Sequence, residues 1–243
     1  YGTEGMIQTA QNIADDFNIS RSDQDVFSHK SQEKAHLAQQ NGSLAREIIP
    51  VSISSGKKDT LEVSKDEHPR LTSLNKLGSL RSITGENGSI TAGNASGVND
   101  GAAALLIASA DAVKKYHLKP KVKILGMTTV GVLPRIMGMG PVPATLKLLK
   151  KLGLNLKDLD LIELNEAFAA QSLACIRELG LKDDDPRINP LGGAIALGHP
   201  LGMSGARIVS SAYYQMVNSD AKRALCTMCI GVGQGIAIVL EKV

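Results

Sequence analysis

The feature that most constrains the fold is an alternation of short apolar segments with amphipathic ones in the C-terminal part of the chain. Short apolar segments predict buried strands, and longer segments with apolar residues at helical spacing predict helices. The predicted strands are residues 103–108, 122–129, 159–164, 224–229 and 236–241, and the predicted helices are residues 110–116, 141–152, 167–179 and 203–217. Strands alternating with helices predict an α/β fold, layered around a mixed or parallel sheet.

The N-terminal part has a different organisation. We expect a helix over residues 3–17 and a second that opens at Ser20 with Asp23 in a capping-box spacing and ends at Asn41-Gly42. Residues 48–89 are irregular and rich in Ser, Lys, Asp and Gly, with a strand-like piece over residues 49–54. We expect this part to be an excursion on the surface of a larger molecule.

Composition excludes several classes of protein. With 43% hydrophobic and 21% charged residues, the chain of 243 residues has the composition of an ordered globular protein. A net charge of +3 and 3% aromatic residues argue against a nucleic-acid partner. The longest apolar run, residues 102–108, is far too short to span a membrane. Three cysteines, an odd number, fit a reducing compartment, and we expect a cytoplasmic location.

Residues 99–108 and 233–240 resemble each other weakly, because both run from glycine into an apolar strand-like segment. Duplication of an α/β half is one explanation, and two ordinary buried strands are the other. If the chain carries a duplication, residues 101–117 are the last strand and helix of a first half whose other strands are absent. A lone strand cannot satisfy its backbone or bury both faces.

A histidine lies in a glycine-dense segment, Gly192-Gly-Ala-Ile-Ala-Leu-Gly-His-Pro-Leu-Gly-Met-Ser-Gly. A lone histidine is ordinarily a structural loop residue. Glycines, however, let backbone amides approach a reacting group, and the helix predicted after His199 favours the neutral, basic form of its imidazole. We therefore predict that His199 is a base in acyl-transfer chemistry on a thioester or carbonyl.

Cys226 and Cys229 form a Cys-x-x-Cys pair, which could be a redox pair or half of a metal site. The pair ends a predicted strand, whereas redox motifs open a helix, and a structural zinc needs four ligands, so we predict no metal site. Cys229, just before Gly231-Val-Gly-Gln-Gly, is the candidate reactive thiol, and Cys226 and Cys175 are predicted core residues. A strand follows these glycines instead of a helix, which excludes a dinucleotide-binding loop.

Asn165 lies at a predicted strand-to-helix junction, before Glu166-Ala-Phe-Ala-Ala-Gln. Asparagine commonly caps a helix at such a place, and α/β proteins also place functional sites there. Spacing alone leaves both roles open.

Four segments together resemble the thiolase family, in this order and at plausible spacings. They are Asn94-Ala-Ser-Gly-Val-Asn-Asp-Gly, Asn165-Glu-Ala-Phe, Gly192-Gly-Ala-Ile-Ala-Leu-Gly-His-Pro and Cys229-Ile-Gly-Val-Gly. The resemblance covers essentially the whole chain and is highly specific. Through Asp66-Glu-His-Pro-Arg and the segment from Ala224 to Gly235, the chain is most similar to the degradative 3-oxoacyl-CoA and 3-oxoadipyl-CoA thiolases of bacteria.

The resemblance implies a layered α/β fold with two similar halves in five layers, a loop domain inserted in the first half, and assembly into dimers or tetramers. Mapped onto this chain, residues 1–97 resemble the loop domain, on the CoA-binding side and with oligomer contacts. Residues 98–119 resemble the end of the N-terminal half, and residues 120–243 the C-terminal half.

The resemblance also implies roles for single residues. His199 would activate a nucleophilic cysteine and, with a water held by Asn165, stabilise the enolate oxygen of the thioester. Cys229 would exchange the proton on the substrate α-carbon or on the CoA sulfur. The backbone N–H of Gly231 would contribute to a second oxyanion hole. Ser96, Arg70 and Phe168 would lie on the side that binds CoA, which is a substrate; no tightly bound cofactor is implied.

One departure from the family pattern matters, because thiolases carry the nucleophilic cysteine upstream of the loop domain and no segment here matches it. The chain begins at Tyr1 without an initiator methionine or a signal pattern, so we expect that the preceding stretch was removed, is encoded separately, or lies outside a fragment. The first functional hypothesis is the C-terminal part of an acyltransferase that cleaves or forms 3-oxoacyl-CoA in fatty acid or aromatic degradation. The second is a non-catalytic CoA-binding or subunit-interface module. A ketoacyl synthase fits less well, since that group typically has histidine where Cys229 stands.

Overall fold

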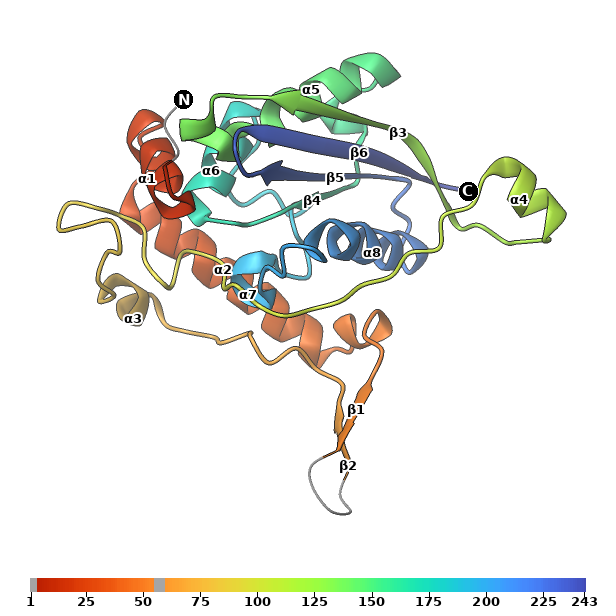
Figure 1. The fold of residues 1–243 in the computed structure, drawn as a ribbon, viewed down its shortest axis with the longest axis horizontal. Coiled ribbons are helices and arrows are strands. Elements are labelled where there is room, and N and C mark those ends of the chain that lie inside the picture. The colour runs from red at the N-terminus through yellow and green to blue at the C-terminus, as the bar shows by residue number, and fades with distance from the viewer. Residues whose placement is uncertain (1–3, 55–59) are drawn as a thin grey trace.

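A mixed sheet of four strands lies at the centre of the molecule (Figure 1). The computed structural model describes residues 4–54 and 60–243. The strands of this sheet are β3 (Val122–Gly131), β4 (Leu161–Leu164), β5 (Arg223–Ile230) and β6 (Gln234–Lys242). Their order is β3-β6-β5-β4, with β6 antiparallel to both neighbours and β4 parallel to β5. The sheet confirms the expected α/β class, and each strand overlaps the segment predicted for it.

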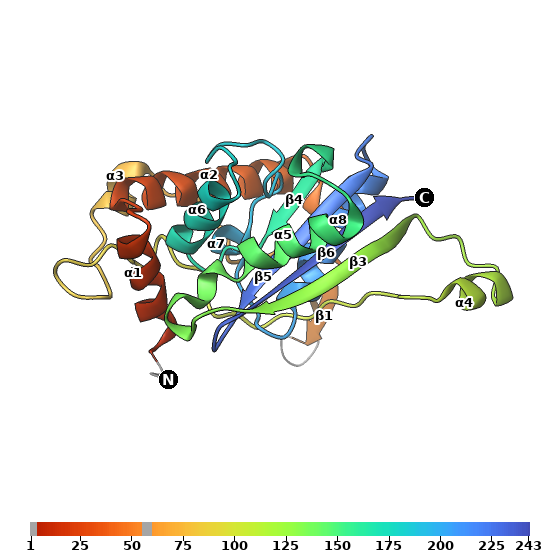
Figure 2. The ribbon, with the colours of Figure 1, turned by 90° about the horizontal axis from the view of Figure 1, so that it is seen from above.

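Helices cover both faces of this sheet (Figure 2). They are α5 (Pro141–Leu152), α6 (Ala169–Glu178) and α8 (Ser204–Val217). The short helix η2 (Pro134–Met139) precedes α5, and the short helices η3 (Leu156–Asp158) and α7 (Ala194–Leu197) lie between the longer ones in the chain. On β5, Leu225 and Cys229 pack into an apolar cluster with α5 and α6, whereas Ala224 and Cys226 pack against α8. Because successive strand side chains point to opposite faces, β5 contributes to both layers.

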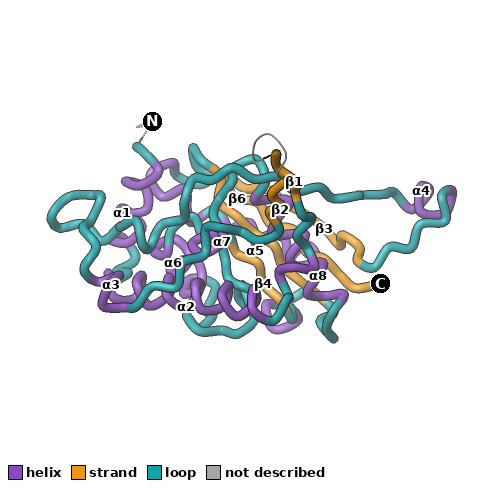
Figure 3. Tube along the Cα trace, turned by 90° about the horizontal axis from the view of Figure 1, so that it is seen from below, coloured by secondary structure: helices purple, strands orange, loops and turns teal. Residues whose placement is uncertain are grey.

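The N-terminal helices pack on the same apolar cluster as α6 (Figure 3). They are α1 (Met6–Asp16) and α2 (Arg21–Gln40), followed by η1 (Leu44–Arg46) and later by α3 (Leu74–Gly78). Ile13 of α1 and Phe27 of α2 are both buried there. The Ser20 hydroxyl accepts a 3.0 Å hydrogen bond from the backbone N–H of Asp23, so the predicted start of α2 is confirmed. Among the described helices, none is both long and apolar enough to cross a bilayer.

A two-stranded hairpin projects from the body of the molecule (Figure 1). Its strands, β1 (Val51–Ser54) and β2 (Thr60–Val63), are antiparallel. Residues 55–59 between them, which belong to the region expected to be irregular over residues 48–89, lie outside the described residues. Val51, Ile53 and Leu61 are exposed on it. A two-stranded hairpin is marginally stable in water, so this element leaves apolar surface that the described residues do not cover.

The strand predicted over residues 103–108 is wrong for this chain. The segment is extended but pairs with no other described strand, and Leu106 and Ile107 are 89% and 69% exposed. The weak echo of residues 233–240 therefore does not reflect two buried strands. An apolar segment becomes a strand only where a neighbouring strand takes up its backbone hydrogen bonds. The short helix α4 (Ala110–Lys115) that follows has no buried residue and stands away from the sheet (Figures 1 and 2).

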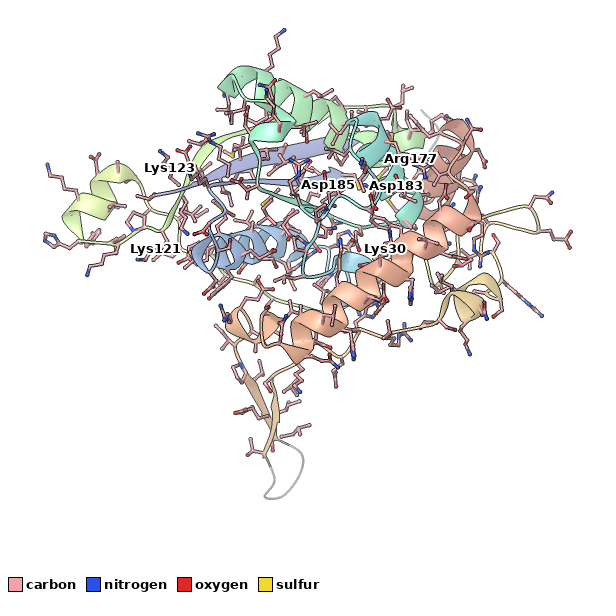
Figure 4. The ribbon with its side chains drawn as sticks, turned by 180° about the vertical axis from the view of Figure 1, so that it is seen from behind. Lys30, Lys121, Lys123, Arg177, Asp183 and Asp185 are labelled. Carbon is pink, nitrogen blue, oxygen red and sulfur yellow. The ribbon has the colours of Figure 1, made fainter. Side chains whose placement is uncertain are left out.

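Ion pairs on the surface join α2 to the segment after α6 (Figure 4). Arg177 of α6 contacts Asp23 at 2.9 Å and Asp183 at 2.7 Å. Figure 4 shows Lys30 of α2 on the same side of the molecule. Exposed ion pairs of this kind contribute roughly 0–1 kcal/mol each to the stability of the fold. Burial of α2 side chains such as Phe27 in the apolar cluster therefore does more to hold α2 in place.

We expect the chain, when made alone, to associate with itself through the exposed segment of residues 98–108. Leu106 and Ile107 expose apolar surface beside unpaired backbone groups, which favours pairing with other chains. Sedimentation velocity should show concentration-dependent association, and the amides of residues 103–108 should exchange rapidly with deuterium. The double substitution Leu106→Ser/Ile107→Ser should reduce the association without changing the circular dichroism spectrum. A monodisperse monomer with protected amides in this segment would contradict the prediction.

Candidate active site

Two loops meet backbone to backbone at His199. The N–H of His199 donates to the carbonyl oxygen of Gly97 at 3.0 Å and to Oδ1 of Asn99 at 3.2 Å. Gly198 has φ +92°, and a Cβ there would overlap the side chain of Asn99. The glycine before the histidine is therefore required by backbone conformation and by the close approach of Asn99.

The hydrogen bonds of His199 determine which ring nitrogen carries the proton. The Ser204 hydroxyl donates to the carbonyl oxygen of Pro200 at 3.0 Å, and His199 Nδ1 lies 2.5 Å from the same hydroxyl oxygen. A hydroxyl has one proton, so Nδ1–H of His199 must donate to Ser204. In the neutral ring, Nε2 then carries the lone pair and accepts a hydrogen bond from Nδ2 of Asn165 at 3.3 Å. His199 is arranged as a base at Nε2.

The surroundings of His199 favour its neutral form. Burial lowers the pKa of the imidazole from its ordinary value of 6.5, and the positive charge of Arg207 lowers it further. Ser204 is the first residue of α8, so the expectation of a helix N-terminus close behind the histidine is confirmed. At neutral pH the ring can accept a proton.

Asn165 lies beside His199 and does not cap the helix that follows. Phe168 is the N-cap residue of α6, and no side chain caps that helix, so the N-cap role is wrong for Asn165. The residue is fully buried, its N–H donates to the carbonyl oxygen of Thr227 at 3.0 Å, and its Nδ2 faces His199. The parallel pairing of β4 with β5 thus places Asn165 at the end of the sheet, beside the histidine.

The next residue, Glu166, holds three parts of the chain together. Its carboxylate is 2% exposed and accepts hydrogen bonds from Ser31 Oγ of α2 at 2.7 Å, Asn189 Nδ2 at 2.8 Å and the N–H of Ile195 in α7 at 3.2 Å. Ser31 Oγ also accepts from the N–H of Gly193 at 3.1 Å. The loop that carries His199 is thereby attached to the residue beside Asn165.

Cys229 lies near the end of β5, on the face that carries α5 and α6. Burial raises the pKa of its thiol to about 12, so the group is protonated at neutral pH. Within residues 4–54 and 60–243, no hydrogen bond joins it to His199 or Asn165. The thiol thus carries its proton at neutral pH and is poorly suited to attack as a thiolate.

The other two cysteines are core residues, as predicted. Cys226 belongs to the apolar cluster under α8, on the opposite face of β5 from Cys229, so the two thiols cannot act as a redox pair or chelate one metal ion. The Cys175 thiol donates to the carbonyl oxygen of Gly138 at 3.2 Å and is fully buried. Burial raises the pKa of both thiols.

Gly231 begins the turn between β5 and β6. The next residue, Val232, has φ +68° and is 77% exposed. Met6, the first residue of α1, is the nearest neighbour to a Cβ placed on Gly231, at 3.9 Å from its sulfur. The N–H of Gly231 donates to no atom of the described residues, so it can bind an external acceptor.

The structure brings together two of the three residues predicted on the CoA side. Ser96 donates to the carbonyl oxygen of Ala167 at 3.0 Å, and Ala95 forms a β-bridge with Phe168. Phe168 is 8% exposed. Arg70 lies apart from them on the surface, where its N–H donates to Gln32 Oε1 at 2.7 Å.

Residue patterns missed four contributors: Glu166, Ser204, Asn99 and His68. Asn99 Nδ2 lies 3.3 Å from His68 Nδ1, and a Cβ on Gly97 would overlap the ring of His68. Ser204 follows His199 by five residues in the same glycine-dense segment, and that was its only local signal. Glu166 and Asn99 stand within the segments that resemble the family, but nothing local indicated their contacts, because their partners are distant in the sequence.

Comparison with protein-family models gives two matches that together span the chain. Residues 118–242 match "Thiolase, C-terminal domain", and residues 1–111 match "Thiolase, N-terminal domain". The second match ends within α4, just after the exposed segment of residues 98–108.

Individual relatives agree with these matches. The chain is 57% identical to "Beta-ketoadipyl-CoA thiolase" of Pseudomonas aeruginosa over 100% of this chain and 61% of that protein. It is 46% identical to "Acetyl-CoA acetyltransferase" of Syntrophomonas wolfei over 96% of this chain and 59% of that protein. Among solved structures, the Bacillus anthracis acetyl-CoA acetyltransferase superposes with a TM-score of 0.93 at 39% identity, covering 98% of this chain and 60% of that one. Human mitochondrial 3-ketoacyl-CoA thiolase in complex with CoA superposes with a TM-score of 0.91 at 46% identity, covering 98% of this chain and 59% of that one. The chain spans about three fifths of the length of these relatives.

We expect Gly193→Ala to destabilise the loop that carries His199. A Cβ on Gly193 would overlap the buried carboxyl group of Glu166, which must shift and lose hydrogen bonds. Overpacking of this kind costs about 1–3 kcal/mol, measurable by urea unfolding. Gly202→Ala, in the same loop, is the matched control: a Cβ there has no neighbour within 4 Å, and a change below about 0.5 kcal/mol is expected. Equal stabilities of the two variants would show that Glu166 is not held in place.

Proposed function

The chain belongs to the thiolase family, and from this premise we propose that it is the C-terminal part of an acetyl-CoA C-acyltransferase. The reaction is CoA-dependent thiolytic cleavage of a 3-oxoacyl-CoA, or the reverse condensation of acetyl-CoA. The observation that carries this proposal is the group Asn165–His199–Ser204, which leaves one imidazole nitrogen of His199 unprotonated at the end of the sheet.

His199 acts as the general base in this proposal. Its Nε2 takes the proton from a nucleophilic thiol, while Nδ1–H stays bonded to Ser204 and keeps the ring oriented. The thiolate then attacks the 3-oxo carbonyl carbon, and the bond between C2 and C3 breaks with its electron pair on C2. Asn165 beside the protonated ring, with a water, stabilises the enolate oxygen that forms on the thioester.

Cys229 acts as the acid. Its protonated thiol gives a proton to C2 of the enolate and so completes acetyl-CoA. The resulting thiolate takes the proton of the CoA sulfur, and CoA then accepts the acyl group. The unengaged N–H of Gly231 contributes to the hole that stabilises the oxyanion of this second transfer.

We propose that CoA approaches on the side of Ser96, Phe168 and Arg70, as a substrate with no tightly bound cofactor. The similarity to several proteins named beta-ketoadipyl-CoA thiolase supports a 3-oxoadipyl-CoA type of substrate and a role in aromatic degradation. The three described thiols are free and buried, which supports a cytoplasmic location.

The nucleophilic cysteine, in this proposal, belongs to a part of the complete protein outside this chain. All three thiols here have a raised pKa from burial, and none is a ready nucleophile. This division fits an arrangement in which residues 1–97 are the loop domain, residues 98–119 are the end of the first half and residues 120–243 are the second half. Supplying the first half, as an upstream extension or a separate chain, should yield an active dimer or tetramer.

The exposed segment of residues 98–108 favours a second candidate function, a non-catalytic subunit-interface fragment. The two candidates differ in the chemistry of the complete polypeptide. Thiolysis of a 3-oxoacyl-CoA by that polypeptide would establish the enzyme, and CoA binding without turnover would establish the interface or binding module.

In the complete polypeptide, we expect His199→Ala to lower kcat by about 100-fold or more while the fold is retained. Because burial and Arg207 hold the pKa of His199 below 6.5, kcat/KM should stay level from neutral pH to below 6.5 and then fall as the base is protonated. His36→Ala is the control, since His36 is exposed on α2 and bonds only to Gln40. Near wild-type turnover of His199→Ala would remove the proposed base.

The two cysteines of β5 should respond differently to serine substitution. Cys229→Ser should severely depress exchange of the substrate α-protons with solvent, followed by NMR in deuterated buffer, because a hydroxyl is a far weaker acid than a thiol. Cys226→Ser should cost mainly packing, about 1 kcal/mol in thermal or urea unfolding. Equal loss of proton exchange in both variants would support a joint role for the two thiols instead.

A further inference from the structure

A second set of polar side chains lies next to the group Asn165–His199–Ser204, between the same strand and the same helix. Glu163 lies in β4, and Asn165 is the first residue after that strand, two positions further along the chain. Leu161 packs on the α8 side of the sheet, so the alternation of strand side chains directs Glu163 to the same side. Arg207 follows Ser204 by three residues, one turn along α8. The polar residues thus form two pairs. Asn165, just after β4, and Ser204 of α8 lie around the histidine, and Glu163 of β4 and Arg207 of α8 form a lower pair next to them.

The lower level is buried and loosely paired. Glu163 is 1% exposed and accepts a hydrogen bond from Gln215 Nε2 at 2.8 Å. Arg207, with its side chain 11% exposed, approaches Glu163 only to 3.6 Å. Neither Nη1 nor Nη2 of Arg207 makes a hydrogen bond to the described residues. Glu163 therefore compensates the guanidinium charge of Arg207 only loosely, and a charge acts over a longer range in a buried setting than in water.

Among residues 4–54 and 60–243, the charged and titratable groups that face Arg207 come from several parts of the chain. Glu163 comes from β4, Glu47 from the end of η1, Asp66 from the segment after β2, and His199 from the loop before α8. Glu47 is bonded to Ser211 at 3.0 Å. The Cys226 thiol lies on the same face of the sheet, and Glu166 acts on Glu163 from the other side.

We propose that Arg207 is a positioning residue for the reaction, whose charge, held beneath Ser204 by Glu163, keeps the His199 imidazole neutral and its Nε2 free to take a proton. This inference rests on the proposed function, in which His199 is the base. It assigns a role to a side chain that touches neither substrate nor the reacting atoms.

The titration of Glu163 strengthens the effect of the Arg207 charge on His199 below neutral pH, where His199 would otherwise be protonated. Burial raises the pKa of Glu163 to about 7. Below neutral pH its carboxyl group is protonated, so the charge of Arg207 is less compensated and opposes protonation of His199 most strongly. Above neutral pH Glu163 ionises and offsets that charge, but His199 is already neutral there.

The simpler role for this pair is to fasten α8 to β4. The two roles predict different shifts of the His199 pKa. If charge matters, loss of the cation and loss of the carboxylate shift the His199 titration differently; if only packing matters, both variants disturb it alike.

The test is the pKa of His199, followed by NMR of histidine 13Cε1 in the complete polypeptide and assigned with His199→Gln. Arg207→Met should raise the His199 pKa and move the acid limb of the kcat/KM profile upward with it. Arg207→Lys, which keeps the charge, should leave both near the wild-type values. Glu163→Gln should not raise the pKa. Arg223→Met is the control, because Arg223 is paired with Glu241 at 2.9 Å on the sheet surface and should change neither value.

The inference is overturned if Arg207→Met leaves the pKa of His199 unchanged, or if Glu163→Gln raises that pKa to the same extent as Arg207→Met. Should Arg207→Met fail to fold because Glu163 is left unpaired, the double variant Glu163→Gln/Arg207→Met removes both charges and should still show the upward shift. The titration needs no turnover. A wild-type protein with the expected shifts but no thiolysis would therefore refute the proposed function alone, and turnover without the shifts would refute this inference alone.

Discussion

The buried carboxylate of Glu166 is the interaction on which the rest of the site depends. A carboxylate 2% exposed is stable only when its oxygens are hydrogen-bonded, and its donors come from α2, from Asn189 and from the start of α7. The segments around residue 31, residue 166 and residues 189–195 must therefore converge on one point. Since Glu166 directly follows Asn165, the same convergence brings the loop of His199 against that asparagine.

The two faces of the sheet have different chemical characters, and the site uses both. The face under α5 and α6 is apolar and contains Cys229, whose thiol stays protonated because burial raises its pKa. The face towards α8 carries Glu163 of β4, which Arg207 of α8 approaches to 3.6 Å. The protonated Cys229 thiol and the His199 imidazole, whose pKa is lowered by burial, thus lie in different surroundings.

Much of the fold could be predicted from local pattern. The helix expected over residues 141–152 is α5 residue for residue, because it opens with prolines and ends at Gly153, which has φ +65°. Strands β5 and β6 were found from their apolar runs. The histidine was found because its glycines are unusual in any structural context. Asn165 was left between two roles, since a helix cap and a site residue occupy the same kind of junction, and only the observed cap at Phe168 decided it.

The sequence by itself determined where the strands and helices of the second half lie, which thiol stands next to the turn of Gly231, and which histidine lies in a glycine-dense loop. These properties depend on neighbours within a few residues. Only the tertiary structure decided that Leu106 and Ile107 are exposed, that Cys226 and Cys229 face opposite sides of β5, and that Ser31 and Arg207 lie around the site. Pairing, burial and charge act between residues that meet only in the folded chain, and the same apolar segment is a strand or an exposed loop according to whether a partner strand lies beside it.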